Sequence, residues 1–171
     1  RIGLENVTYI INGTKEAAVF SVTDLSGSME DSCGENPSFF CCLFSGDFCG
    51  SEQTCNSCGG AWEQRITLAK EANNILIEAI LNFTDNRVGL TGYKDLAYNQ
   101  DYHILSDDEN SLSSKVNQWS ANGATCICCG INKATQGFIH DSSPDKLKAM
   151  IVMSDGIANR ECAEQGTGSS S

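Results

Sequence analysis

The pattern of hydrophobic and polar residues predicts four strands. Residues 17–23 (AAVFSVT) form a nearly continuous apolar run, which is typical of a strand buried on both faces of a parallel sheet. Residues 87–93 (RVGLTGY) alternate as a strand does, and residues 102–105 (YHIL) fit a strand at the edge of a sheet. The run KAMIVMS at 148–154 predicts a second buried strand, which ends just before Asp155.

The same pattern predicts three helices, in which apolar residues recur every three or four positions. The longest covers 61–83, and its apolar positions are Trp62, Ile66, Ala69, Leu76, Ala79, Ile80 and Phe83. The second follows a capping box formed by Ser106 and Glu109. Its apolar positions are Leu112, Val116 and Trp119. The third starts near Gly130, and its inward residues are Ile131, Ala134 and Phe138.

Strands that alternate with helices predict an α/β fold, with a Rossmann-like and mainly parallel sheet flanked by helices. A length of 171 residues suits one domain with an ordinary core, so we expect a single domain over 1–171. Residues 31–60 differ from the rest, because they contain six cysteines and show little periodicity. They predict a cysteine-rich loop insertion held by cross-links.

The charge balance limits the classes of partner. Against 22 Asp and Glu stand 11 Lys and Arg, which gives a net charge of −11. Nucleic-acid binding requires a basic surface, so this composition argues against it and favours small cations as partners. No apolar run reaches the roughly 20 residues that cross a bilayer, so we expect no membrane span in this chain.

Cysteines and glycosylation sequons indicate an exported protein. Ten cysteines are an even number and far more than an intracellular chain of this size usually carries. Three Asn-x-Ser/Thr sequons are candidate glycosylation sites, at Asn6, Asn12 and Asn82. We therefore expect an extracellular or cell-surface location.

Disulfides are the favoured state of the cysteines, and zinc binding is the alternative. Cys55 and Cys58 have the spacing of zinc ligands, whereas the sequons favour an oxidising exterior. Spacing alone does not fix the pairing. We expect the six cysteines of 31–60 to pair among themselves: Cys33, Cys41, Cys42, Cys49, Cys55 and Cys58. We expect the other four to pair around the loops beside Thr125 and Asp155: Cys126, Cys128, Cys129 and Cys162.

Oxygen-bearing side chains follow two of the predicted strands. Asp24, Ser26 and Ser28 form an Asp-x-Ser-x-Ser sequence, and alternate residues of an extended loop face the same side. Asp155 follows the last strand, and ligands of parallel sheets bind where the strands end. Two carboxylates about 4 Å apart repel by about 4 kcal/mol at an effective dielectric constant of about 20, so a cation is expected between them. The alternative is that Asp24 and the serines cap a helix.

Three segments closely resemble the metal-ion-dependent adhesion site of the von Willebrand factor type A domain. They are VTDLSGSM at 22–29, NGATCICCGINKA at 122–134 and MIVMSDGIAN at 150–159, in the family's order. The resemblance implies that two serines and a threonine bind the metal directly, and that the aspartates often act through water. Carried onto this chain, the metal-binding residues are Asp24, Ser26, Ser28, Thr125 and Asp155. Thr125 follows Asn-Gly-Ala, where the family commonly has two glycines.

Carboxylate and hydroxyl oxygens suit a hard divalent cation and disfavour zinc. We expect Mg²⁺ first, with Ca²⁺ or Mn²⁺ as alternatives. The donor set holds few carboxylates, so an open coordination position would attract an acidic group from a partner. The resemblance accordingly implies an extracellular adhesion module that binds a protein or glycan ligand.

The end of the chain departs from the family. The family sheet usually has two further strands after the one that ends at Asp155, whereas this chain continues into GTGSSS. We therefore expect a fragment of a longer protein. The alternative function is a structural subunit of a surface filament or coat, whose sheet is completed by a strand from a neighbouring subunit. An enzyme is not expected, because no Gly-x-Ser-x-Gly elbow or catalytic base accompanies the serines.

Overall fold

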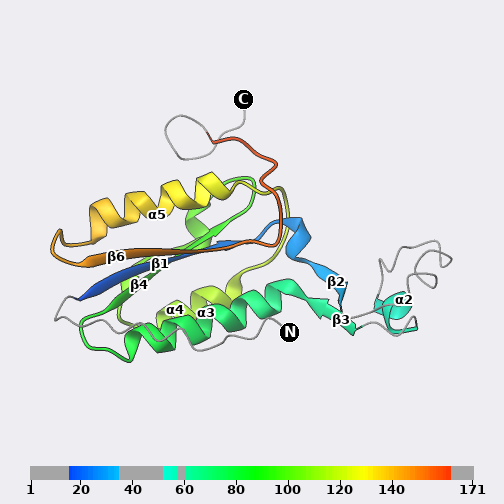
Figure 1. The fold of residues 1–171 in the computed structure, drawn as a ribbon, viewed down its shortest axis with the longest axis horizontal. Coiled ribbons are helices and arrows are strands. Elements are labelled where there is room, and N and C mark those ends of the chain that lie inside the picture. Colours follow the sequence, from blue (N-terminus) through cyan, green and yellow to red (C-terminus); the bar gives the residue numbers. More distant parts are fainter. Residues whose placement is uncertain (1–15, 35–51, 58–60, 163–171) are drawn as a thin grey trace.

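A computed structural model describes residues 16–34, 52–57 and 61–162 of the chain (Figure 1). The sequons at Asn6 and Asn12, and the side chains of all six cysteines in 31–60, lie outside the described residues. Asn82 is exposed at the end of a helix, and its glycosylation stays a prediction. No helix in the described ranges has the length and apolar character needed to cross a bilayer.

A four-stranded sheet forms the centre of the molecule, in the order β5-β4-β1-β6. Strands β1 (Ala17–Asp24), β4 (Arg87–Tyr93) and β6 (Leu147–Met153) are parallel. Strand β5 (Tyr102–Ser106) runs antiparallel to β4 at one edge. The predicted α/β fold with a mainly parallel sheet is therefore confirmed.

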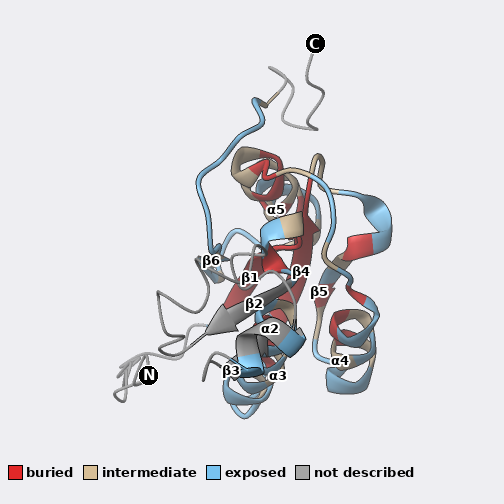
Figure 2. Cartoon of the chain, turned by 90° about the vertical axis from the view of Figure 1, so that its right-hand side faces the viewer, coloured by how far each residue is buried: buried red, intermediate tan, exposed pale blue. Residues whose placement is uncertain are grey.

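Helices cover both faces of the sheet. Helix α5 (Ile127–Asp141) lies on one face, and α3 (Arg65–Leu81) and α4 (Glu109–Gln118) lie on the other (Figures 1 and 2). Every residue of β1 is buried as a result, which explains its nearly continuous apolar sequence.

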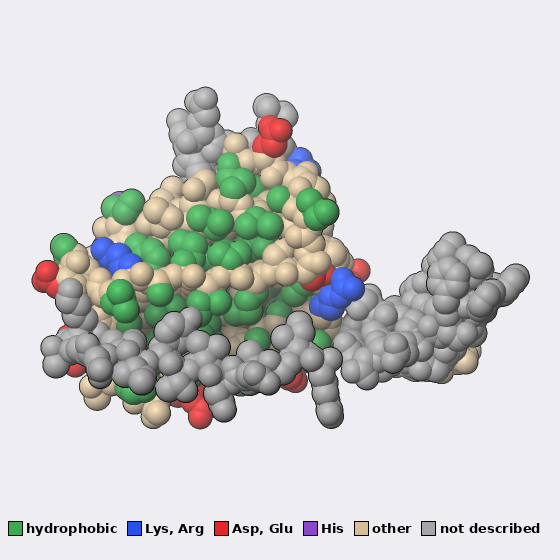
Figure 3. Space-filling view, in the orientation of Figure 1, with side chains coloured by type: hydrophobic (Ala, Val, Ile, Leu, Met, Phe, Trp, Pro, Cys, Tyr) green, Lys and Arg blue, Asp and Glu red, His purple; other side chains and the backbone are tan. Residues whose placement is uncertain are grey.

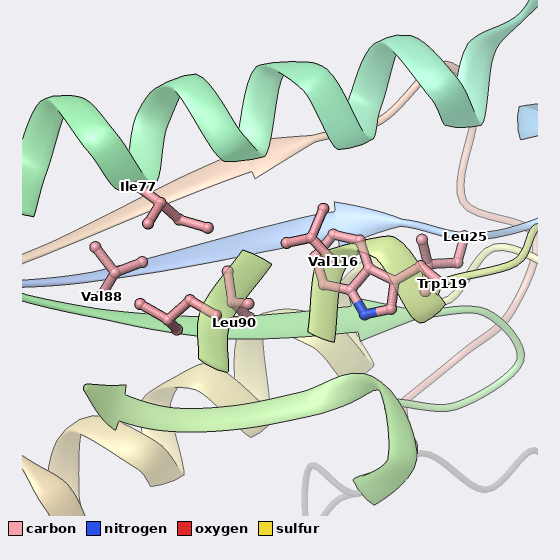
Figure 4. Close-up of a cluster of buried hydrophobic side chains, with 7 residues drawn as sticks. Leu25, Ile77, Val88, Leu90, Val116 and Trp119 are labelled. Carbon is pink, nitrogen blue, oxygen red and sulfur yellow. The ribbon is translucent and has the colours of Figure 1, made fainter. Parts of the chain in front are cut away.

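Each face of the sheet packs its own hydrophobic cluster. On one face, Ile77 of α3 and Val116 of α4 lie over Val88 and Leu90 of β4, with Trp119 beside them (Figure 4). The cluster on the other face includes Ala18, Phe20, Val22, Tyr93, Leu105 and Ala134. These two clusters hold the sheet rigid beneath the loops at its ends.

The ring of Phe20 explains two glycines. It packs edge-to-face on Phe138 of α5, with 4.9 Å between ring centroids. A Cβ atom at Gly89 of β4 or at Gly137 of α5 would overlap this ring. Only glycine lets β4 and α5 approach Phe20 this closely.

The predicted helix over 61–83 is wrong at its start. Residues Ala61–Gln64 form strand β3, which pairs antiparallel with β2 (Asp31–Gly34), and the helix begins only at Arg65. Trp62 therefore lies on a strand. The backbone groups of these residues bond across the hairpin, which overrides the helical spacing of the apolar side chains. The segment 31–60, predicted as a loop, thus starts with a strand, and it also contains α2 (Glu52–Ser57).

The inward face of α3 also differs from the prediction. The buried positions are Ala69, Asn73 and Ile77, whereas Ala79 is exposed and Phe83, beyond the helix end, is 67% exposed. Asn73 is polar, but its side-chain amide is satisfied inside the protein. It accepts a hydrogen bond from Ser21 Oγ at 2.6 Å, and it donates one to the Ala69 carbonyl oxygen at 2.7 Å. A prediction based only on the spacing of apolar residues misses a buried helix face that contains a polar residue such as Asn73.

Helices α4 and α5 lie where the sequence predicts helices, but the first residue or the cap of each differs from the prediction. The N-cap of α4 is Asp108, which accepts a hydrogen bond from the Ser111 amide at 3.1 Å. The predicted cap, Ser106, instead accepts one from the Asp108 amide at 3.0 Å. The predicted inward residues Leu112, Val116 and Trp119 are buried. Helix α5 begins at Ile127, three residues before Gly130.

Strand β6 is not the buried strand that the sequence predicts. It pairs only with β1 among the described residues, and so it forms the second edge of the sheet. Leu147 is 47% exposed and Val152 is 43% exposed. The apolar run of β6 therefore faces partly outward, a point that the composition of the strand does not reveal.

We predict that Ile77→Ala lowers the free energy of unfolding by about 2–5 kcal/mol, because Ile77 is 0% exposed between α3 and β4. Ile75→Ala, a matched change at a position 58% exposed on the same helix, is expected to shift stability by less than about 0.5 kcal/mol. Urea denaturation followed by circular dichroism measures both. Equal losses for the two variants would contradict this assignment of the core.

Candidate metal centre

The candidate site lies at the carboxyl ends of β1 and β6, where three loops meet. The first loop follows Asp24, the second contains Thr125, and the third follows Met153. Parallel strands end on the same side of a sheet, so β1 and β6 bring Asp24 and Asp155 to the same place. The hairpin of β2 and β3 leaves the domain at this end (Figure 1).

Asp24 connects the first loop to the third. Its carboxylate is fully buried, and Oδ1 accepts a hydrogen bond from the Ser26 amide at 2.8 Å. The other oxygen, Oδ2, accepts one from Ser154 Oγ at 2.7 Å and one from the Tyr93 hydroxyl at 3.3 Å. The donors come from three separate segments, so the position of Asp24 depends on all of them.

Tyr93 is a neutral donor in this arrangement. Burial raises the pKa of its hydroxyl well above the usual range, and the negative charge of Asp24 raises that pKa further. The hydroxyl therefore keeps its proton and contributes a hydrogen bond without a charge.

The two serines link Asp24 to Asp155. Ser26 Oγ lies 3.0 Å from Ser28 Oγ, and Ser28 Oγ donates a hydrogen bond to Asp155 Oδ1 at 2.8 Å. Ser26 occupies the N-cap position of the short 3₁₀ helix Gly27–Met29, but it forms no side-chain capping bond. Helix capping, the alternative drawn from the sequence, therefore does not account for the serines.

Thr125 is held between the first and third loops through its backbone. The Gly27 amide donates to the Gly123 carbonyl oxygen at 2.9 Å, which joins the first two loops. The Thr125 amide donates to Asn159 Oδ1 at 2.7 Å, and the Asn159 amide donates to the Thr125 carbonyl oxygen at 3.1 Å. The Thr125 hydroxyl forms no hydrogen bond with the other four candidates, all of which lie in the described residues. Its role as the fifth ligand stays a prediction.

Several residues at the site were missed by the sequence patterns. Asp95 Oδ1 accepts a hydrogen bond from the Ala124 amide at 2.6 Å and so fixes the second loop, which turns at Gly123 with φ +77°. A signal for it existed, because Asp95 follows the end of β4 much as Asp24 ends β1. Ser154 is adjacent to Asp155, but no spacing rule points to its contact with Asp24.

Arg65 is a further missed residue, and it lies on the rim of the site. Its Nη1 contacts Asp155 Oδ2 at 2.6 Å and donates to the Ser28 carbonyl oxygen at 3.1 Å. Arg65 is the first residue of α3, directly after β3. It stands 37 positions after Ser28 in the chain, so no local pattern connects the two residues.

Two disulfides lie beside the second and third loops. They join Cys126 to Cys129 and Cys128 to Cys162. These are the four cysteines that were expected to pair with one another around the loops. The second bridge connects α5 to the chain beyond the third loop, and the first lies directly after Thr125. Both bridges restrict the loops that carry Thr125 and Asp155.

The donor set fits a hard divalent cation. Its side chains offer carboxylate and hydroxyl oxygens, which are the ligands of Mg²⁺, Ca²⁺ and Mn²⁺. Among the described residues, Asp24 receives hydrogen bonds from neutral donors and contacts no Lys or Arg. A buried carboxylate whose described partners are all neutral has no positive charge beside it, and a cation at the site would supply one.

Comparison with known proteins shows the fold. No protein-family model matches the chain, and no curated protein matches its sequence. The von Willebrand factor domain of Mfa5, a type V pili tip protein from Porphyromonas gingivalis, has a TM-score of 0.60 and 19% identity, over 85% of this chain and 40% of that chain. PilB, a minor pilin from Streptococcus sanguinis, has a TM-score of 0.59 and 23% identity, over 86% of this chain and 31% of that one.

A third similar structure is GBS104, an adhesive tip pilin from Group B Streptococcus agalactiae. Its TM-score is 0.60 at 18% identity, over 84% of this chain and 46% of that chain. This chain thus spans less than half the length of all three proteins. The common fold is a von Willebrand factor-like α/β domain, found here in pilus tip proteins and a minor pilin.

We predict different losses of stability from the two disulfides. Replacing both Cys128 and Cys162 with Ser opens a loop with a sequence separation of 34 and is expected to cost roughly 4 kcal/mol by chain entropy. Replacing both Cys126 and Cys129 with Ser opens a separation of only 3 and is expected to cost about 2 kcal/mol. Urea denaturation without reductant measures both, and the reverse order would contradict the pairing.

Proposed function

We propose that the chain is an extracellular adhesion module that holds a divalent cation and binds an acidic group of a protein or glycan partner. The observation that carries the proposal is the hydrogen-bonded series from Asp24 through Ser26 and Ser28 to Asp155. The proposed metal-binding residues are Asp24, Ser26, Ser28, Thr125 and Asp155. Mg²⁺ is the proposed ion, with Ca²⁺ or Mn²⁺ as alternatives.

The residues of the site have separate tasks in this proposal. When bound, the cation supplies a positive charge that attracts a carboxylate. The hydroxyls of Ser26 and Ser28 offer neutral ligand oxygens, and Asp24 holds the first loop in place through the Ser26 amide. Ser154 and Tyr93 fix the orientation of Asp24. The site binds and does not catalyse.

The negative net charge of the chain explains why a cation would be needed to bind an acidic partner. A chain with a net charge of −11 repels an acidic partner at long range. At physiological salt, charges are screened beyond a Debye length of about 8 Å, so a cation at the loop ends would attract a carboxylate that comes into contact with it. The similar structures support an adhesive role, because they include the tip protein Mfa5 and the adhesive tip pilin GBS104. In an extracellular setting, Asn6, Asn12 and Asn82 are proposed glycan acceptors.

We predict that Asp24→Asn lowers the affinity for Mg²⁺ by at least about tenfold, because it removes the buried charge and keeps a similar shape. Isothermal titration calorimetry measures the affinity. Asp85→Asn is the matched control, since Asp85 is exposed before β4, and its positive φ of 68° suits Asn as well as Asp. An unchanged Mg²⁺ affinity in Asp24→Asn would exclude this site.

The adhesive function itself is tested by binding to arrays of immobilised glycans and extracellular proteins. Wild-type protein is expected to bind in Mg²⁺ and to lose binding in a chelator, and Asp24→Asn is expected to bind in neither condition. Binding that persists in the chelator would rule out the cation as the contact.

The exposed edge of β6 favours a second candidate function, a subunit of a surface filament. Its outer backbone groups have no partner strand among the described residues, and its side chains are partly apolar. Figure 3 shows hydrophobic side chains gathered across this side of the molecule, along β6 and the helices that flank it. Ile151 and Val152 of β6 are 37% and 43% exposed.

The proposed occupant of this edge is a strand from a neighbouring subunit. A free edge pairs readily with an added strand, and native edges are usually protected by charge, proline or a bulge. In β6, Lys148 is the single charged residue and proline is absent. The minor pilin PilB is among the similar structures, which supports assembly into a filament.

We predict that this chain self-associates as its concentration rises, and that Val152→Lys prevents it by placing a charge on the β6 edge. Size-exclusion chromatography with light scattering measures the mass. Ile104→Lys is the matched control on β5, the opposite edge, where Ile104 is 55% exposed. A wild-type chain that stays monomeric at all concentrations would count against the filament role.

A further inference from the structure

Arg65 places a positive charge directly beside the candidate metal centre. Its Nη1 contacts Asp155 Oδ2 at 2.6 Å, while the other oxygen, Oδ1, accepts a hydrogen bond from Ser28. The same nitrogen donates to the Ser28 carbonyl oxygen at 3.1 Å. Arg65 thus contacts two of the five proposed metal-binding residues.

Part of the Arg65 guanidinium remains available to a partner. A guanidinium has five N–H donors, and both contacts to described residues come from Nη1. The Arg65 side chain is 44% exposed, whereas that of Asp155 is 15% exposed. The guanidinium therefore lies between the carboxylate it pairs with and the solvent from which a ligand arrives.

The ion pair alters the charge of the site. Asp155 is engaged on both oxygens, one by Ser28 and the other by a cationic group. A positive charge in contact with Asp155 opposes the attraction of that carboxylate for a cation. It also increases the attraction of the same region for an anion. One residue thereby affects cation and anion in opposite directions.

We propose that Arg65 is a second binding group for the carboxylate of the partner, next to the cation. This inference rests on the proposed function and names the ligand class, a carboxylate held at both oxygens. One oxygen faces the cation, and the other accepts hydrogen bonds from Arg65. The planar guanidinium matches a carboxylate in a way that a lysine ammonium does not. Arg65 accordingly weakens cation binding and strengthens carboxylate binding.

A purely structural role is the competing explanation. Ion pairs with an exposed partner contribute little to stability, and Arg65 would then simply connect the start of α3 to the first loop. Such a role predicts no change in carboxylate binding apart from changes in folding. A structural role predicts changes in binding only where folding changes. A role in binding predicts that loss of Arg65 strengthens cation binding and weakens carboxylate binding.

The test uses Mn²⁺ as the ion and acetate as the carboxylate, with acetamide as the neutral counterpart. Water-proton relaxation reports Mn²⁺ binding, and its decrease on titration with acetate reports the displacement of metal-bound water. The variants are Arg65→Gln and Arg65→Lys, each checked for folding by circular dichroism. Arg87→Gln is the matched control, because Arg87 is exposed at the start of β4, the opposite end of the strand.

For Arg65→Gln we expect Mn²⁺ affinity to rise roughly three- to tenfold, because a repulsive charge is removed. We expect acetate affinity to fall roughly tenfold, because charge-assisted hydrogen bonds are lost. For Arg65→Lys we expect Mn²⁺ affinity within about twofold of wild type and weakened acetate binding, because the charge remains without the planar fork. Arg87→Gln is expected to change neither, and acetamide is expected to bind to none of the proteins.

The outcomes separate this inference from the proposed function. Wild-type protein that binds Mn²⁺, with Arg65→Gln unchanged in both affinities, overturns the inference and leaves the metal site in place. A fall in both affinities also overturns it, because it indicates a structural role for Arg65. Wild-type protein that does not bind Mn²⁺ overturns the proposed function, and the inference with it.

Discussion

The buried carboxylate of Asp24 is the constraint on which the rest of the site depends. A charge removed from water must be satisfied by hydrogen bonds, and Asp24 obtains them from Ser26, Ser154 and Tyr93. These donors belong to the first loop, the third loop and the end of β4. The hydrogen bonds to Asp24 therefore hold the first loop, the third loop and β4 together at the end of β1. Ser26, Ser28 and Asp155 are hydrogen-bonded in series beside this carboxylate.

The sheet makes this arrangement possible because β1 lies between two parallel strands. Helices on both faces bury β1 completely, so the strand is a rigid base for Asp24. Polar residues within β1 do not weaken it, since Ser21 and Thr23 bond to Asn73 of α3. The similar pilus proteins share the fold at 18%, 19% and 23% identity, which shows that the fold tolerates wide changes in sequence.

The sequence predicted what local patterns encode and missed what chain topology decides. Periodicity located β1, β4 and β5, and the alternate spacing of Ser26 and Ser28 places their hydroxyl oxygens 3.0 Å apart. Periodicity could not show that β6 is an edge strand, because burial depends on which strand lies beside it. Arg65 and Asn73 reach the first loop and β1 from a helix far along the chain, so no local window contains both partners.

The hairpin of β2 and β3 has a consequence for how such a domain diversifies. Its register closes from Asp31 opposite Gln64 to Gly34 opposite Ala61, so the chain leaves and re-enters the domain at neighbouring points. Any segment whose ends fit that stem can be exchanged without disturbing the central sheet. Because the stem adjoins Ser28 on one side and Arg65 on the other, each exchanged segment would emerge beside the same loops. One unchanged base can thus carry inserted segments of different length and sequence.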